Sequence, residues 1–155
     1  MIVLSKTQQQ KYNQIVKKLK FKKIRLTDIR NIVIKMLIIS DHLTIQEIIN
    51  NLESEINNIN VMSVYNTIDL LLKEHIVFAN TFNGKDISYE IAADKSVHLK
   101  CDECLKVIHL DDKNIKNYHF LELLDLCEKY NIKLTHFKIE GHGYCLKCSN
   151  KEINK

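Results

Sequence analysis

Two Cys-x-x-Cys pairs constrain the fold of this chain more than any other feature. Cys101 and Cys104 form the first pair, and Cys145 and Cys148 form the second pair after a gap of forty residues. Each pair on a tight turn directs two thiolates to one point, and two such turns supply the four ligands of a tetrahedral Zn²⁺ ion. Four sulfur ligands leave no open coordination position, so the spacing predicts a structural zinc site.

Two alternatives to zinc are a pair of disulfides and four unrelated buried thiols. Redox enzymes with a Cys-x-x-Cys disulfide usually carry one such motif, and nothing in this sequence accounts for two, so zinc is favoured. The fifth cysteine, Cys127, differs from the other four. It recurs at helical spacing with Phe120, Leu123 and Leu124, which predicts that it is a small buried hydrophobic residue.

The length and composition bound the class of protein. A chain of 155 residues with 45% hydrophobic content can form one domain or two small ones. No hydrophobic run approaches the roughly 18 residues of a membrane span, and the amino terminus becomes polar too early for a signal peptide. We therefore expect a soluble, cytoplasmic protein with no membrane partner, a compartment in which cysteines stay reduced.

The basic residues are concentrated near the amino terminus. Residues 6–35 contain ten Lys or Arg and one acid, Asp28, although the formal net charge of the whole chain is only +4. A basic block of this kind is typical of a protein that binds a polyanion such as DNA. A solvated helix face in a lysine-rich chain is the alternative, and charge alone does not separate the two.

The amino-terminal half is predicted to be a winged helix-turn-helix domain. Thr44 and Glu47 form a capping-box signature for one of its helices, and Asn83-Gly84 is a strong hairpin signal. Apolar periodicity predicts helices at 8–20, 27–40, 44–52 and 61–74, and strands at 76–82 and 87–91. Helices followed by a hairpin favour a fold in which the fourth helix enters the major groove of DNA.

The carboxyl-terminal part has a different pattern. It predicts strands at 97–100 and 107–110, a helix at 114–130 and a strand at 133–140. A unit of about sixty residues has a thin core, so we expect it to need zinc and a second subunit, which makes the protein a homodimer. The expected fold class is α+β, with a winged-helix DNA-binding domain (1–92), a hinge (93–96) and a small α/β dimerisation and metal-binding domain (97–155).

Several short segments occur in an order and at separations that match one family. They are Arg25–Arg30, His42–Ile48, Ser63–Ile68, His98–Ile108 and Gly143–Cys148, the fourth reading His-x-x-Cys-x-x-Cys-Leu-Lys-Val-Ile. On these segments the chain resembles the ferric uptake regulator family of bacterial metal-responsive repressors over roughly residues 12–149. It departs from the family at Asp28, where proline is usual, and at Asn66, where arginine is usual.

The resemblance implies a second, regulatory metal site. Its ligands would be His42, Glu90, His98 and His109, a mixed set that suits Fe²⁺, Mn²⁺, Zn²⁺ or Ni²⁺. The family usually has a further histidine at the position of Ser96, and Asp or Glu at the position of His109, so this set is shifted toward Zn²⁺ and away from Mn²⁺. Asp94 or Asp111 is expected to take the place of the missing ligand.

DNA contacts are predicted at four residues. If Tyr65 lies on the exposed face of its helix, its ring can pack on thymine methyl groups, while Ser63 can reach a phosphate or a base edge. Arg25 matches a basic residue that enters the minor groove in the family, and Asn66 replaces a long cation with a short amide. Ordinary helix packing is the alternative for Tyr65.

These observations favour a metal-dependent, DNA-binding transcriptional repressor that controls metal uptake or homeostasis. Iron is the leading candidate for the sensed metal and zinc the next, and the partner is palindromic, AT-rich double-stranded operator DNA. The alternatives are a peroxide-sensing repressor of the same family and a zinc-stapled protein-interaction scaffold. An enzyme is not expected, because four thiolates leave the zinc no open position and no catalytic motif is visible.

Overall fold

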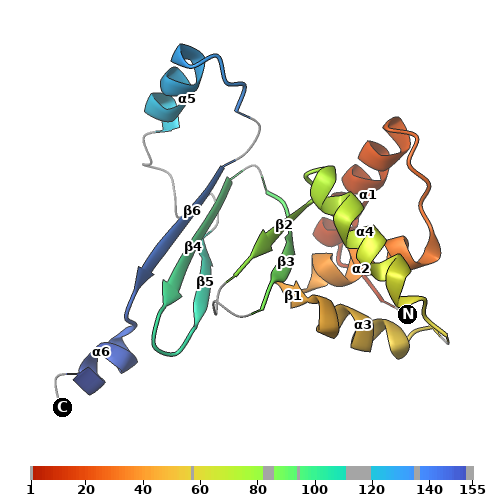
Figure 1. Cartoon of the computed structure of the whole chain (residues 1–155), viewed down its shortest axis with the longest axis horizontal. Helices are drawn as coiled ribbons and strands as arrows, with labels where there is room; N and C mark the ends of the chain where they lie inside the picture. Colours follow the sequence, from red (N-terminus) through yellow and green to blue (C-terminus); the bar gives the residue numbers. More distant parts are fainter. Residues whose placement is uncertain are drawn as a thin grey trace. The chain divides into compact units, whose positions relative to one another are not determined.

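The computed structural model describes residues 2–56, 58–81, 86–93, 95–110, 120–134 and 137–152 (Figure 1). The chain divides into two compact units, Met1–Ala92 and Ala93–Lys155, which are described separately below. The predicted Asn83-Gly84 turn and the two substitute ligands, Asp94 and Asp111, lie outside the described residues.

Four helices form most of the first unit, and three of them begin at side-chain caps. They are α1 (Lys6–Phe21), α2 (Asp28–Ile39), α3 (Ile45–Glu53) and α4 (Val61–Lys73). Thr44 and Glu47 form the predicted capping box of α3, and Thr27 accepts a hydrogen bond from the Arg30 amide at the start of α2. These caps satisfy backbone amides that have no partner inside the helix. The capping residues therefore allowed the helix starts to be predicted, although the sequence contains no proline.

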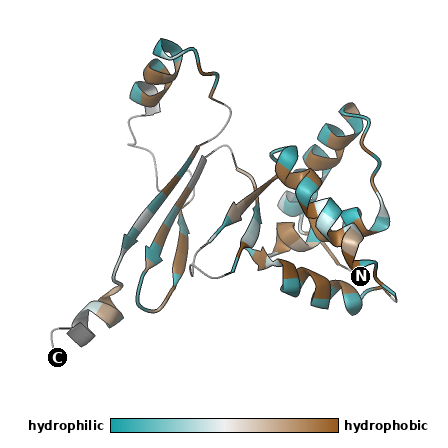
Figure 2. Ribbon diagram, in the orientation of Figure 1, coloured by the Kyte–Doolittle hydropathy of each residue, from teal (hydrophilic) through white to brown (hydrophobic). Residues whose placement is uncertain are grey.

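The four helices share one hydrophobic core. Val33, Ile48, Val64 and Leu71 are fully buried at its centre, and the apolar faces of the helices can be followed in Figure 2. The inner face of α4 buries Val64, Ile68 and Leu71, whereas Leu72 is half-buried. Because this face is held in the core, the opposite side of α4 is presented to solvent.

A small antiparallel sheet completes the first unit. Its order is β1-β3-β2, formed by β1 (Leu43–Thr44), β2 (Val77–Asn80) and β3 (Ser88–Ile91). The two predicted strands are present but shorter than predicted. β1 was not predicted, because two residues are too few to show an alternating pattern and their pairing with β3 depends on the tertiary fold.

The second unit is built on another three-stranded sheet. β4 (Lys95–Cys101) is central, with β5 (Val107–Leu110) antiparallel on one side and β6 (Phe137–Gly143) parallel on the other. β4 begins earlier than predicted, so Lys95 and Ser96 lie in a strand rather than in the predicted hinge. β6 also differs from the predicted strand at 133–140. It starts at Phe137 and continues to Gly143, because β4 offers pairing partners along its whole length.

Two helices accompany this sheet, α5 (Phe120–Lys129) and α6 (Leu146–Glu152). Residues 114–119 of the predicted helix lie outside the described residues, and α6 was not predicted. Cys127 is half-buried, so the prediction of a fully buried thiol is wrong for the single chain. Its neighbours Leu123, Leu124 and Leu126 are also exposed. A row of exposed leucines on one helix favours burial against another molecule.

Candidate metal centres and nucleic-acid interface

The four paired cysteines converge in the second unit. Cys101 ends β4, Cys104 follows it on a turn, Cys145 precedes α6 and Cys148 lies inside α6. Their sulfur atoms all lie within 4.8 Å of one another, and the Cys104 and Cys145 sulfurs are 3.9 Å apart. A regular tetrahedron with Zn–S bonds of about 2.3 Å has sulfur atoms about 3.8 Å apart. The four cysteines therefore fit a Zn²⁺ ion.

Hydrogen bonding lowers the pKa of one thiol in this cluster and raises the pKa of another. Backbone N–H groups of Cys104 and Cys145 lower the pKa of the Cys101 thiol to about 6, and the Cys145 amide lies 3.3 Å from its sulfur. A hydrogen bond with Cys145, together with burial, raises the pKa of Cys148 to about 12. Thiols at this separation share protons because neighbouring thiolates repel, and a divalent cation removes that repulsion. In the described chain none of the five cysteines forms a disulfide.

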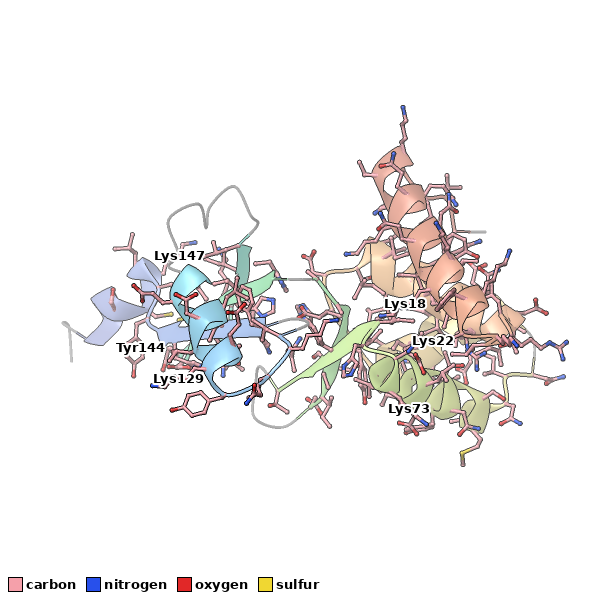
Figure 3. All side chains as sticks on the ribbon, turned by 90° about the horizontal axis from the view of Figure 1, so that it is seen from above. Lys18, Lys22, Lys73, Lys129, Tyr144 and Lys147 are labelled. Carbon is pink, nitrogen blue, oxygen red and sulfur yellow. The ribbon has the colours of Figure 1, made fainter. Side chains whose placement is uncertain are left out.

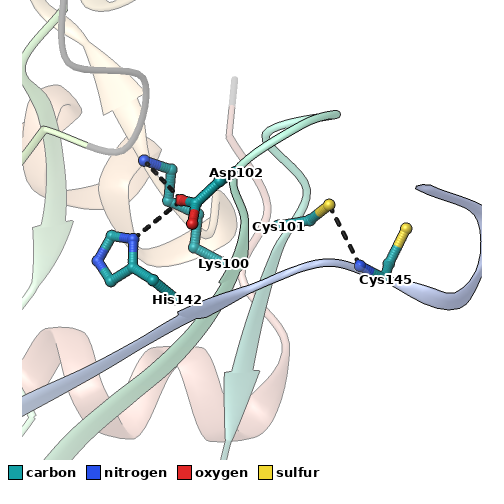
Figure 4. A network of polar contacts seen from close by, with 5 residues as sticks. All are labelled: Lys100, Cys101, Asp102, His142 and Cys145. Carbon is teal, nitrogen blue, oxygen red and sulfur yellow. Dashed lines mark hydrogen bonds and ion pairs between the residues drawn. The ribbon is translucent and has the colours of Figure 1, made fainter. Parts of the chain in front are cut away.

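An unpredicted polar network adjoins the first cysteine turn (Figure 4). The His142 Nδ1 atom lies 3.0 Å from the Asp102 carboxylate, and the Lys100 ammonium lies 3.8 Å from the same oxygen. The Asp102 amide also donates to the Gly143 carbonyl oxygen over 2.9 Å. These contacts join the turn to both β4 and β6. These contacts could not be predicted from the sequence, because they depend on the parallel pairing of the two strands.

Leu105 gives a stability prediction at this turn. Its φ of 59° lies in the left-handed region that glycine prefers, and its side chain is exposed. Leu105→Gly should remove the steric cost of that conformation, about 1–2 kcal/mol, at a smaller cost in unfolded-chain entropy, for a net stabilisation of about 1 kcal/mol. Chemical denaturation of the zinc-loaded protein would measure it. Leu146→Gly, on an exposed helical leucine, is the control and should destabilise. A destabilised Leu105→Gly protein would contradict the prediction.

His98 and His109 lie together in the second unit. The two residues pair across β4 and β5, and their rings meet edge to face with centroids 4.4 Å apart. His98 is only 2% exposed, whereas His109 is exposed. Ser96 lies on β4 two residues before His98. Two imidazoles on one face of the sheet provide nitrogen ligands of the kind that a borderline divalent metal binds.

The other two predicted ligands, His42 and Glu90, belong to the first unit. Glu90 lies in β3 and is buried, and His42 is half-buried immediately before β1. β1 pairs with β3 as Thr44 with Ser88 and Leu43 with Tyr89. This pairing begins at Leu43, so His42 lies just outside it. The first unit therefore carries an imidazole immediately before β1 and a carboxylate within β3.

The predicted DNA-reading residues of α4 lie on its outer face. Tyr65 is 45% exposed, Asn66 is exposed and Ser63 is half-buried. Sequence reasoning did not assign a role to Met62, which is 63% exposed one helical turn before Tyr65. The apolar periodicity of the helix already placed Met62 off the inner face, so its exposure could have been predicted from the sequence. The outer face of α4 thus combines apolar and amide groups suited to base edges.

The basic block has more than one role in the first unit. Arg25 is exposed in the segment before α2, and Arg30 donates a hydrogen bond to its carbonyl oxygen. Lys22 forms an ion pair with Glu74, and the Lys18 ammonium lies 3.4 Å from the His75 carbonyl oxygen. Both lysines are labelled in Figure 3. Cations near a helix carboxyl terminus stabilise its dipole, so these two lysines support the end of α4. Part of the block is therefore structural, while Arg25 is accessible to a ligand.

Comparison with known proteins identifies similar chains along most of this length. The model of the ferric uptake regulator family matches residues 21–142. The peroxide operon regulator of Bacillus subtilis is 24% identical over 132 residues, covering 83% of this chain and 87% of the relative. The peroxide-responsive repressor PerR of Staphylococcus saprophyticus is 25% identical over 134 residues, covering 83% and 84%.

Solved structures show the same fold. The ferric uptake regulator Fur of Helicobacter pylori superposes with a TM-score of 0.64 at 24% identity, covering 92% of this chain and 93% of that one. A zinc uptake regulator complexed with zinc and DNA gives a TM-score of 0.58 at 22% identity, covering 96% and 99%. Among the described helices of the present chain, none has both the length and the apolar character needed to cross a membrane.

Proposed function

Because this chain belongs to the ferric uptake regulator family, we propose that it is a homodimeric, metal-dependent transcriptional repressor acting in the cytoplasm on genes of metal uptake or metal homeostasis. One observation carries the proposal. The chain combines four thiolates that converge in the second unit with imidazole and carboxylate groups on the strands of both units, and the outer face of α4 in the first unit is suited to DNA. The protein is not an enzyme, because the family consists of regulators.

The two ligand sets have different tasks in this proposal. Cys101, Cys104, Cys145 and Cys148 hold Zn²⁺ permanently, because four thiolates close its coordination shell. The regulatory set binds a metal that exchanges with the cellular supply, and its ligands come from both units: His42, Glu90, His98 and His109. A metal held by both units favours one relative orientation of the DNA-binding halves. The metal binds the DNA-binding conformation more tightly than the other conformation, so a higher metal concentration raises the affinity for DNA.

The chemistry of the regulatory set bears on the metal. Two histidines and a carboxylate suit Fe²⁺, Zn²⁺, Mn²⁺ and Ni²⁺, and His109 adds a nitrogen where the family usually has a carboxylate. This exchange weakens binding of Mn²⁺, which prefers oxygen, and strengthens binding of Zn²⁺. Iron remains the leading candidate because it is the family's usual cue, and zinc is the next.

DNA reading is assigned to α4 and the segment before α2. Tyr65 and Met62 present apolar surface to thymine methyl groups, and Asn66 presents an amide that pairs with adenine. Ser63 and Arg25 contact the sugar-phosphate backbone or the neighbouring minor groove. The operator is double-stranded, AT-rich and palindromic, since a homodimer places two such helices on symmetric half-sites.

Peroxide sensing is the second candidate, and one observation favours it. The two curated relatives compared above are both peroxide regulators. In such a mechanism bound Fe²⁺ reacts with peroxide and a ligand histidine is oxidised. Ser96 occupies one of the positions where an oxidisable histidine would lie, which leaves His42 as the other candidate and ranks this function below metal sensing.

A DNA-binding experiment tests the proposal. Zinc-loaded protein should select AT-rich palindromes from random duplexes, and Fe²⁺ or Zn²⁺ should tighten that binding at least tenfold, with affinity falling steeply as salt rises. Fluorescence anisotropy measures the affinity. Indifference of DNA binding to every metal would contradict the sensor, and absence of binding to any duplex would favour a scaffold. Release of the Fe²⁺ complex by peroxide, with added oxygen on His42 by mass spectrometry, would favour the peroxide function.

A further inference from the structure

Three potential metal ligands form one row across the sheet of the second unit. His98 in the central strand β4 pairs with His109 in β5 and with Glu140 in β6. Paired residues on adjacent strands project from the same face of a sheet, with strands about 4.8 Å apart. Strand pairing therefore brings the three residues into one row, although they lie far apart in the sequence and the Glu140 carboxylate does not lie within 4.8 Å of both imidazoles.

We propose that Glu140 is a ligand of the regulatory metal and takes the place of the histidine that the family has at Ser96. The inference deepens the proposed function, because it assigns a further ligand to the same site. A carboxylate oxygen beside two imidazole nitrogens is a donor set for Fe²⁺ or Zn²⁺. It also supplies a negative charge that lowers the cost of holding a divalent cation on a sheet.

The register explains why the site shifts toward Glu140. Ser96 pairs with Lys138 on β6, so the pair at which the family's histidine would lie carries an ammonium group. A cation there disfavours a divalent metal on that side of His98 by electrostatic repulsion. Glu140 is one pair further along the same face, directly beside His98. The ligand lost on β4 is thereby replaced from the neighbouring strand.

Glu140 is accessible enough to turn toward a metal. Its carboxylate lies 3.7 Å from the Lys138 ammonium, and the two side chains are 31% and 26% exposed. An ion pair with this much solvent exposure is weak, and a glutamate at a sheet surface can change rotamer at little cost. The alternative is that Glu140 forms only a surface ion pair with Lys138 and does not bind metal. The two hypotheses predict different changes in metal affinity when Lys138 is replaced.

The experiment uses the full-length protein with its four cysteines already loaded with Zn²⁺, to which Co²⁺ is added as a spectroscopic probe. Glu140→Gln should lower the affinity for Co²⁺ at least about tenfold and change the intensity of its visible absorption bands, since one ligand is lost. Lys138→Gln should raise the affinity several-fold, because a competing cation is removed. Glu128→Gln, an exposed acid on α5, is the matched control and should change neither.

The outcomes separate this inference from the proposed function. A Co²⁺ affinity within twofold of wild type in Glu140→Gln, with an unchanged spectrum, would overturn the role of Glu140 while leaving metal-dependent DNA binding of the wild type intact. If metal did not change the DNA affinity of the wild-type protein, both the role of Glu140 and the proposed function would be overturned. If Glu140→Gln lost its structural zinc, Lys138→Gln would decide: a higher Co²⁺ affinity supports the inference, and an unchanged affinity refutes it.

Discussion

Cys104→Ser should release the zinc ion and unfold residues 93–155. Zinc bound by four cysteines contributes on the order of 10 kcal/mol of folding free energy at neutral pH, comparable to the whole net stability of a typical domain. Cys104 is exposed, so replacing its sulfur with oxygen costs little in packing and a large effect must come through the metal. Metal analysis of the purified variant and its thermal unfolding curve measure the two losses.

The chain contains its own control for this experiment. Cys127 lies on α5, outside the cluster, and Cys127→Ser should keep one tightly bound zinc ion and nearly the wild-type unfolding temperature. The first unit should stay folded in both variants, because the buried residues of its core all lie between Ile15 and Ile91. A Cys104→Ser protein that retained its zinc and melted like the wild type would refute the structural role of the cluster.

His98→Ala should abolish the tightening of DNA binding by metal while the protein remains a zinc-containing dimer. His98 is buried next to His109, and loss of its imidazole should lower the affinity for the regulatory metal by about 100-fold, the upper end of effects seen for residues that support a metal site. The cavity left by the ring should cost about 1–3 kcal/mol of stability, so binding is measured well below the unfolding temperature. Anisotropy titrations with and without Fe²⁺ or Zn²⁺ report the loss.

His75→Asn provides the comparison for that variant. His75 is exposed at the end of α4 and has a φ of 49°, a conformation that asparagine tolerates well. This variant should respond to metal like the wild type. Should His98→Ala bind DNA with the same metal dependence as His75→Asn, His98 would not be a ligand, and the regulatory site would have to be sought elsewhere.

The sequence alone determined the parts of this protein that depend on local chemistry. The starts of α2 and α3 could be predicted because Thr27, Thr44 and Glu47 satisfy backbone amides within the same turn. The inner face of α4 followed from the spacing of Val64, Ile68 and Leu71. The cysteine pairs predicted a zinc site because two residues of spacing already place two thiolates on one turn, and the structure brings all four sulfurs together.

The tertiary structure decided what depends on which strands become neighbours. β1 exists only because Leu43 and Thr44 meet β3, and β6 continues to Gly143 because β4 offers partners there. The same parallel register places Glu140 beside His98 and His142 beside Asp102. Strand pairing over long separations is fixed by the shared burial and hydrogen bonding of the whole sheet. No short segment of sequence contains that information, so these contacts became visible only in the folded chain.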